Sequence, residues 1–182
     1  MAEAPKVAYF AYGSNMDGST LRVRRSIDWS RATAACAKGW QLVIRKPSLL
    51  GGAAGAMANI IADAASEVWG VLYEITADDL EHLELTEGVK IGHYERTEVV
   101  VEPVERWDED GAATVRAVTL TSGTEDPSLR PTARYMELLL SGAAEHGLPE
   151  SWIETLRRFE TAEIATEAEL RSLFDHAMKK PA

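Results

Sequence analysis

Cysteine is almost missing from this chain, in which Cys36 is the single one among 182 residues. One thiol cannot form a disulfide within the chain, and together with four histidines it offers no Cys/His cluster at the spacing of zinc ligands. We therefore expect a reduced, metal-free protein of the cytoplasm. Alanines flank Cys36, which is expected to be a small buried side chain without a reactive role.

Basic residues are also few, since 19 Lys and Arg stand against 29 Asp and Glu and leave a formal net charge of −10. Such an excess of negative charge repels phosphate backbones and anionic lipid surfaces. Long apolar runs are lacking as well, because Asn59 and Asp63 interrupt the Ala/Gly-rich residues 51–65, and residues 1–6 lack the pattern of a signal peptide. We expect neither a nucleic-acid partner nor contact with a membrane.

Several catalytic motifs are absent from the sequence. It has no GxxxxGK[ST] loop for phosphates, no GxGxxG turn for a dinucleotide and no GxSxG elbow for ester hydrolysis. The simplest support for nucleotide or ester chemistry is therefore missing. The histidines stand away from any nucleophile signature, and we expect each to be solvated or structural: His82, His93, His146 and His176.

What is present is the composition of a globular domain, with 46% hydrophobic and 26% charged residues, which is enough for one buried core. Runs rich in Val, Ile, Tyr or Thr predict strands near residues 7–12, 40–45, 68–75, 97–104 and 114–121. Asp110 and Gly111 are expected in a hairpin loop between the last two strands. Strands dominate the first two thirds of the chain and helices the last third, which predicts a single α+β domain over residues 1–182.

The helices are predicted from their caps. Thr76 and Asp79 have the spacing of a capping box at the start of a short helix that Gly88 ends. Pro131 or Thr132 begins a second helix, and Ser151 a third. The second helix is expected to present one face formed by Tyr135, Leu138, Leu139, Gly142 and His146. Residues 161–182 are a possible appended C-terminal helix, beginning at Thr166, that packs on the domain or on a second copy.

A first candidate site follows the strand near residues 7–12. Gly13 tolerates positive φ, so the main-chain N–H groups of Gly13, Ser14 and Asn15 can converge on a carboxylate or a polarised carbonyl oxygen. The alternative is a plain turn in which Ser14 or Asn15 caps the element that follows. The spacing of these residues favours the capping turn.

A second candidate is Glu87, which falls in the last turn of the helix that Gly88 ends. The helix dipole disfavours a negative charge at that end, so a carboxyl group there is suited to accept a proton and return it near neutral pH. The alternative is one more surface glutamate, and the spacing does not decide between the two.

Four segments together resemble the γ-glutamylcyclotransferase family. They are residues 9–15 (YFAYGSN), 67–73 (EVWGVLY), 87–94 (EGVKIGHY) and, after Pro127 and Tyr135, 142–149 (GAAEHGLP). The segments occur in the order typical of the family and cover about residues 7–160. The resemblance implies a small mixed β-barrel with flanking helices and a cofactor-free enzyme, which converts L-γ-glutamyl amino acids to 5-oxoproline and the free amino acid.

The same resemblance assigns roles to individual residues. It makes Glu87 the general base and acid, and it makes residues 9–14 the substrate-holding loop, which Asn15 completes. Tyr94 and Tyr135 match tyrosines at the pocket of the family. The substrate-binding set is therefore Tyr9, Phe10, Ala11, Tyr12, Gly13, Ser14, Asn15, Tyr94 and Tyr135.

Some features leave the substrate open. Residues 46–58 match the family poorly, and such loops often shape a pocket mouth. Asn15 differs from the leucine usual in glutathione-specific relatives, so we expect glutathione to be a poor substrate. The alternatives are a cyclotransferase for γ-glutamyl amines or γ-glutamyl acyl carriers, and a non-catalytic module that binds small acids. A homodimer is possible, as in related enzymes.

Overall fold

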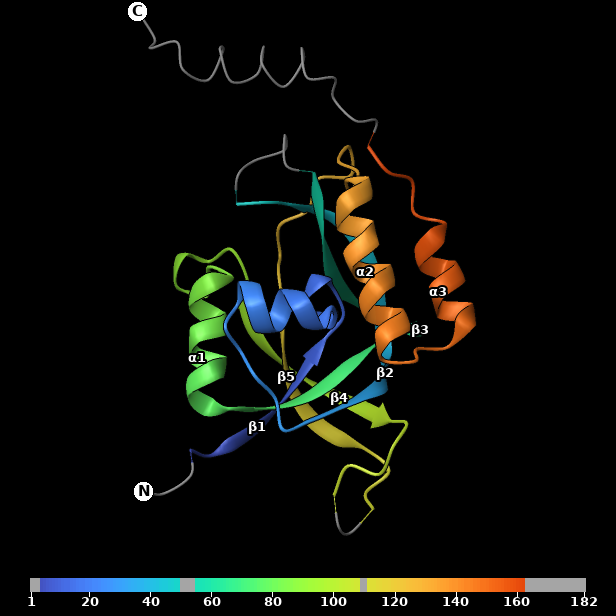
Figure 1. Ribbon diagram of the computed structural model, residues 1–182. Helices are drawn as coiled ribbons and strands as arrows, with labels where there is room; N and C mark the ends of the chain where they lie inside the picture. Colours follow the sequence, from blue (N-terminus) through green and yellow to red (C-terminus); the bar gives the residue numbers. More distant parts are fainter. Residues whose placement is uncertain (1–3, 50–54, 109–110, 163–182) are drawn as a thin grey trace, which may run out of the picture.

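The computed structural model describes residues 4–49, 55–108 and 111–162, in which five strands close into a barrel (Figure 1). The strands are β1 (Lys6–Ala11), β2 (Arg31–Pro47), β3 (Ala56–Thr76), β4 (Glu95–Pro103) and β5 (Val115–Thr121). Their order around the barrel is β1-β3-β2-β4-β5. The barrel is mixed because β1 and β5 pair in parallel, with Tyr9 opposite Val118, whereas the other neighbours are antiparallel. The expected α+β barrel is confirmed.

Helices flank the barrel on two sides. α1 (Ala77–Thr86) lies on one side, and α2 (Ala133–Glu145) and α3 (Glu150–Arg157) lie together on the other (Figure 1). The short segments η1 (Ser14–Met16) and η2 (Thr20–Arg24) follow β1, and η4 (Val89–Ile91) follows α1. In the part of the chain described, no helix has the length and apolarity to cross a membrane.

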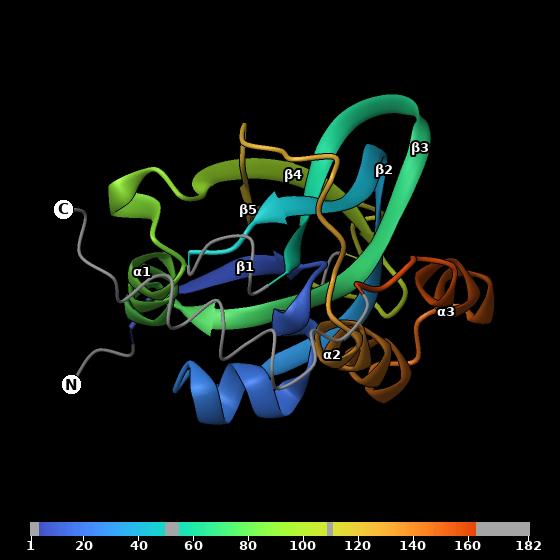
Figure 2. The same cartoon turned by 90° about the horizontal axis from the view of Figure 1, so that it is seen from above.

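β2 and β3 form the longest pair of strands, and both extend well beyond the expected residues 40–45 and 68–75. The missed parts are rich in Ala and Gly, which have low strand propensity. Pairing between the two strands stabilises their extended conformation instead. The paired residues run from Arg31 opposite Glu74 to Pro47 opposite Ala56. A register shift occurs at Gly39, whose φ is +81°, and Figure 2 shows β3 curving along its length.

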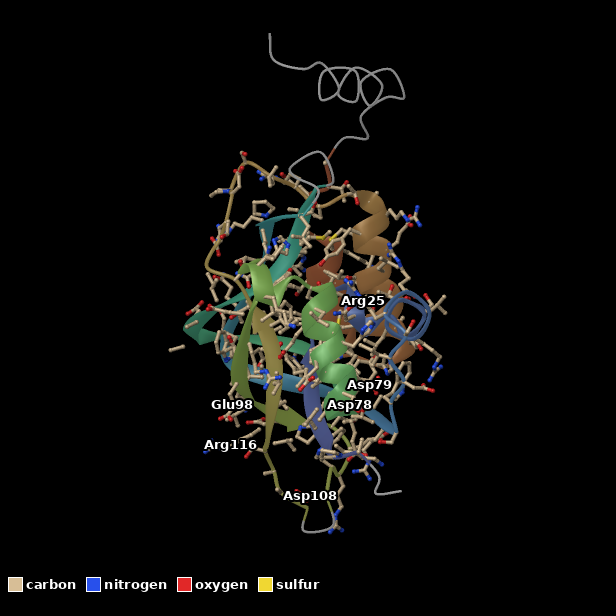
Figure 3. All side chains as sticks on the ribbon, turned by 90° about the vertical axis from the view of Figure 1, so that its left-hand side faces the viewer. Arg25, Asp78, Asp79, Glu98, Asp108 and Arg116 are labelled. Atoms are coloured by element: carbon tan, nitrogen blue, oxygen red, sulfur yellow. The ribbon has the colours of Figure 1, made fainter. Side chains whose placement is uncertain are left out.

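The β4–β5 hairpin is confirmed, with Glu95 opposite Thr121 and Val101 opposite Val115. On its outer face Glu98 and Arg116 form an exposed ion pair of 2.9 Å, and Asp108 lies in the loop beyond (Figure 3). The inner faces of the strands build one core with β1 at its centre. Its fully buried large side chains include Phe10, Met16, Leu21, Ile27, Leu72, Ile75, Leu83, Leu139 and Leu156.

Two helix starts and one helix stop are confirmed. The Thr76 side chain accepts a hydrogen bond from Asp79 N (3.1 Å) at the start of α1, and the Thr132 side chain accepts one from Tyr135 N at the start of α2. Gly88 ends α1 with φ +73°. The buried face of α2 is centred on Met136, Leu139, Gly142 and Ala143 rather than on Leu138.

One helix start was wrong. α3 begins at Glu150 with Pro149 as its N-cap and without a capping side chain, whereas Ser151 lies inside the helix and is exposed. Proline has its φ already restricted, and here φ is −54°, so the chain enters the helix two residues earlier than a cap at Ser151 predicts. The helix predicted from Thr166 lies outside the described residues.

Candidate active site

A cavity of about 250 Å³ opens where β1, η1, the end of α1 and the start of β3 meet. Small-molecule sites are commonly concave and somewhat larger, about 300–1,000 Å³, so this cavity suits a small ligand. Among the predicted site residues it is lined by Tyr9, Tyr12, Gly13, Ser14, Asn15, Glu87, Tyr94 and Tyr135. It is also lined by Arg25, Ser48, Leu49, Met57, Ala58, Thr86, His93 and Leu120, which the sequence analysis did not select.

Phe10 and Ala11 do not line this cavity. Side chains alternate between the two faces of a strand, so Phe10 points away from the face that carries Tyr9. Phe10 is fully buried. A Cβ atom added to Gly70 would lie 2.8 Å from the Phe10 ring and closer still to Ala11 O. Ala11 shares the face of Tyr9 but is buried and is not among the residues that line the cavity.

Glu87 stands at the C-terminal cap of α1 and is mostly buried. Its Oε1 lies 2.7 Å from Arg25 Nη2 and accepts a hydrogen bond from Asn15 Nδ2 at 3.0 Å. Both contacts use the same carboxylate oxygen. No hydrogen bond to Oε2 occurs among the described residues, so this oxygen is open to a ligand in the cavity.

Arg25 follows η2 and lies at the C-terminal end of α1, whereas Asp78 and Asp79 mark the opposite end (Figure 3). A cation at this position offsets the negative end of the helix dipole and pairs with the carboxylate of Glu87. No pattern in the sequence links Arg25 to Glu87. Only the fold brings them together, so the ion pair of Glu87 with Arg25 was not predicted from the sequence.

Asn15 connects the loop after β1 to Glu87. Its Nδ2 donates hydrogen bonds to Tyr9 Oη (3.2 Å) and to Glu87 Oε1, and the residue is only 8% exposed. Its Oδ1 is buried and has no hydrogen-bond partner among the described residues. A buried acceptor without a donor is costly, so a ligand group that donates to Oδ1 would be stabilised here.

The loop after β1 is not a capping turn. Gly13 precedes η1 without any capping side chain, and Ser19 rather than Ser14 or Asn15 precedes η2. Gly13 has φ −116° and so does not use the positive φ that glycine tolerates. The glycine is required for space, because a Cβ there would lie 3.2 Å from Tyr135 Oη and 3.3 Å from Ala58 Cβ.

Four tyrosines surround the cavity, and burial raises the pKa of each. The pKa of Tyr135 rises to about 12, and those of Tyr9, Tyr12 and Tyr94 lie well above their usual range. These phenols therefore stay neutral near pH 7 and act as hydrogen-bonding walls. Tyr94 Oη donates to Ala58 O (2.9 Å), Tyr135 Oη accepts from Ala58 N (2.9 Å), and Tyr12 Oη donates to Leu120 O.

A buried lysine that the sequence analysis missed lies behind one wall of the cavity. Lys46 is 1% exposed, and its Nζ lies 2.8 Å from His93 Nε2. Burial lowers the pKa of Lys46 to about 8, and burial and Lys46 together lower the pKa of His93. His93, expected to be solvated or structural, in fact lines the cavity next to Tyr94.

Comparisons with known proteins agree with the resemblance seen in the sequence. The AIG2-like family matches residues 67–156. Human γ-glutamylcyclotransferase is 27% identical over 179 residues, which cover 88% of this chain and 85% of the human protein. γ-Glutamyl cyclotransferase aclK of Aspergillus oryzae is 30% identical over 83% of this chain and 60% of its own length. A solved structure of a γ-glutamyl cyclotransferase has the same fold, with a TM-score of 0.75 at 24% identity over 94% of this chain and 99% of that one.

Proposed function

We propose that this chain is a γ-glutamylcyclotransferase, which cyclises L-γ-glutamyl amino acids to 5-oxoproline and a free amino acid, with Glu87 as the proton carrier. One observation carries this proposal. The open Oε2 of Glu87, the unpartnered Oδ1 of Asn15 and the loop of Gly13 and Ser14 belong to residues that line the same small cavity.

The reaction needs no protein nucleophile, because the α-amine of the substrate attacks its own δ-carbonyl carbon. Both reacting groups belong to one molecule, so the site gains most by holding the folded conformer in which they meet. The α-amino group has an ordinary pKa of about 8 and carries a proton near pH 7. Glu87 Oε2 accepts that proton, while Asn15 Oδ1 accepts a second hydrogen bond from the same nitrogen.

Attack on the carbonyl places negative charge on its oxygen, and this charge needs donors that are already in place. The main-chain N–H groups of residues 13–15 and the side chain of Ser14 line the cavity beside Tyr135. They serve either this oxygen or the α-carboxylate of the glutamyl group. The neutral phenols and Ala58 close the remaining walls and limit the access of water.

The cycle closes when protonated Glu87 donates its proton to the departing nitrogen. The new C–N bond of the five-membered ring forms and the old amide C–N bond breaks. The α-ammonium group loses two protons in becoming the ring N–H, and the departing nitrogen gains two in leaving as an ammonium group, so Glu87 carries the protons from one nitrogen to the other. Arg25 and Asn15 hold Oε1 throughout, so the carboxyl group keeps its direction in both protonation states.

The first test is the substitution Glu87→Gln, which keeps the shape of the side chain and removes the proton acceptor. We expect a folded protein whose kcat falls by about 10²–10⁴, measured as 5-oxoproline released from L-γ-glutamyl-L-alanine by mass spectrometry. Glu84→Gln is the matched control, because Glu84 lies one turn earlier on α1 and pairs with Arg96 instead of facing the cavity. Turnover at the wild-type rate in the Glu87 variant would refute the role of this residue.

A substrate panel separates the alternatives. We expect turnover of γ-glutamyl dipeptides to exceed that of γ-glutamyl-ε-lysine, γ-glutamylated amines and glutathione. Activity on the amines alone would change the substrate class. Saturable binding of all these compounds without 5-oxoproline would favour the non-catalytic binding module. The homodimer and the cytoplasmic location expected from the sequence stay predictions.

A further inference from the structure

Lys46 is a buried cation without an anionic partner. It stands next to the end of β2 and pairs in register with Met57, a residue of the cavity wall. Its Nζ contacts Pro47 O at 3.2 Å, both ring nitrogens of His93 at 2.8 and 3.1 Å, and the Tyr94 ring at 4.3 Å from the centroid. In the described ranges no carboxylate forms an ion pair with it.

An unpaired buried ammonium is costly, because the interior solvates charge poorly. Apolar residues of similar volume would pack in the same place without that cost. The cost is offset when a ligand brings an anion to the cavity, because a charge-assisted interaction is strong where water is excluded. The position of Lys46 behind the wall of the cavity therefore points to a negatively charged ligand group.

His93 stands between this charge and the cavity. An ammonium group only donates hydrogen bonds, so the ring nitrogen that bonds to Lys46 carries a lone pair. The proton of the neutral ring is then on the other nitrogen, and both nitrogens lie within 3.1 Å of Nζ. Two turn glycines place the ring: Gly88 and Gly92 have φ near +70°, and His93 N donates to Gly88 O at 3.0 Å.

The substrate class proposed above carries two carboxylates and one ammonium. The glutamyl α-carboxylate shares a carbon atom with the reacting amine and must therefore lie on the side of Glu87 and Asn15. Lys46 contacts Pro47, His93 and Tyr94 and forms no ion pair with Glu87 among the described residues, although the charge of Glu87 favours its protonated form. The second carboxylate, on the leaving amino acid, lies across the amide bond that breaks.

We infer that Lys46 and His93 form the subsite that recognises the carboxylate of the leaving amino acid. This inference rests on the proposed function. His93 provides the wall of this subsite, and Lys46 provides the positive charge behind it as a positioning residue. The pair thereby selects γ-glutamyl amino acids over γ-glutamyl amines, in which that carboxylate is missing.

The test compares L-γ-glutamyl-L-alanine with γ-glutamyl-ethylamide, which lacks the carboxylate of the leaving group. We expect wild-type kcat/KM for the dipeptide to exceed that for the amide by roughly tenfold or more, a usual effect of a charged hydrogen bond. Lys46→Met should bring the two substrates to within about twofold, through a higher KM for the dipeptide, and Lys46→Arg should restore part of the preference. Lys38→Met is the control, because Lys38 also lies on β2 but is exposed and pairs with Glu102.

The outcomes are distinguishable. If the wild-type protein converts neither substrate, the proposed function itself fails. If a folded Lys46→Met variant keeps the wild-type preference, or loses activity on both substrates equally, the inference about the leaving group is overturned.

A second measurement on the wild-type protein decides the matter if Lys46→Met does not fold. Burial lowers the pKa of His93 and raises that of Tyr94, whereas Lys46, with a pKa of about 8, is expected to change charge between pH 7 and 9.5. Glu87 and Arg25 are the other charged groups near the subsite. The amine of both substrates titrates in this range too, so its effect cancels in the ratio of their kcat/KM values. We expect the ratio to fall severalfold as the pH rises, and a constant ratio would overturn the inference.

Discussion

At the scale of single residues, Ala58 holds two walls of the cavity together. Its main-chain N–H donates to Tyr135 Oη and its carbonyl accepts from Tyr94 Oη, each at 2.9 Å. Both hydroxyl groups are buried. Each therefore supplies the hydrogen-bond partner of a main-chain group in the cavity wall. The pocket therefore depends on the main chain of one residue of β3 as much as on the tyrosines that the sequence singled out.

Removing one hydroxyl tests this role. Tyr135→Phe leaves the N–H of Ala58 without its partner, which should lower the free energy of unfolding by about 1–3 kcal/mol. We also expect a higher KM, since Tyr135 Oη approaches Ser14 of the substrate loop. Urea denaturation and steady-state kinetics measure the two effects. The control is Tyr73→Phe, which removes a buried hydroxyl that bonds to Met16 O and His146, outside the residues that line the cavity. It should cost stability without raising KM.

At the scale of elements, α1 has one end that serves stability and another that serves the site. Its N-terminus is capped by Thr76, and its C-terminus carries Glu87 followed by Gly88. Gly88 has φ +73°, a conformation that side chains disfavour, and an added Cβ would meet His93 Cβ at 3.0 Å. The two ends should therefore respond differently to substitution.

Thr76→Ala removes a helix cap and should lower the free energy of unfolding by about 0.5–2 kcal/mol without changing kcat or KM. Gly88→Ala should lower stability by about 1 kcal/mol or more and also reduce kcat/KM, because it displaces both Glu87 and His93. Thermal unfolding and kinetics of the two variants measure this contrast. Loss of activity in the Thr76 variant at a temperature where it is folded would contradict the division of roles.

At the scale of the whole molecule, a buried polar cluster joins α2 to the barrel. Tyr73 Oη donates to Met16 O (2.9 Å) and lies 2.9 Å from His146 Nε2. Burial lowers the pKa of His146, although Glu145 and Asp17 favour its protonated form. The neutral ring is therefore the form that packs between the helix and the barrel.

This cluster makes stability depend on pH. Below the ordinary histidine pKa of about 6.5 the unfolded chain binds a proton that folded His146 does not, so the free energy of unfolding falls with falling pH until the folded pKa is reached. The slope contributed by one histidine is at most about 1.4 kcal/mol per pH unit. Urea midpoints at pH 7.5 and 5.5 should differ less in His146→Asn than in wild type. His82→Gln, at an exposed position, should leave the difference unchanged.

Local sequence signals correctly predicted two elements that border the cavity. The run from Tyr9 to Tyr12 predicted a buried strand, and the cap spacing of Thr76 with the stop at Gly88 predicted that Glu87 lies at the end of α1. These features depend on neighbours within a few positions of each other, so the chain itself encodes them. The Ala-rich parts of β2 and β3 were missed because their strand conformation comes from pairing with each other and not from propensity.

The sequence by itself predicted most of the elements, the caps of α1 and α2, and a resemblance to the γ-glutamylcyclotransferase family. The tertiary structure alone decided which charges meet: Arg25 reaches Glu87, and Lys46 reaches His93, across long stretches of chain. The same closure of the barrel turns Tyr9 toward the cavity and Phe10 away from it. The physical reason is that charge pairing and burial depend on distance in space, whereas propensity and capping depend on distance along the chain.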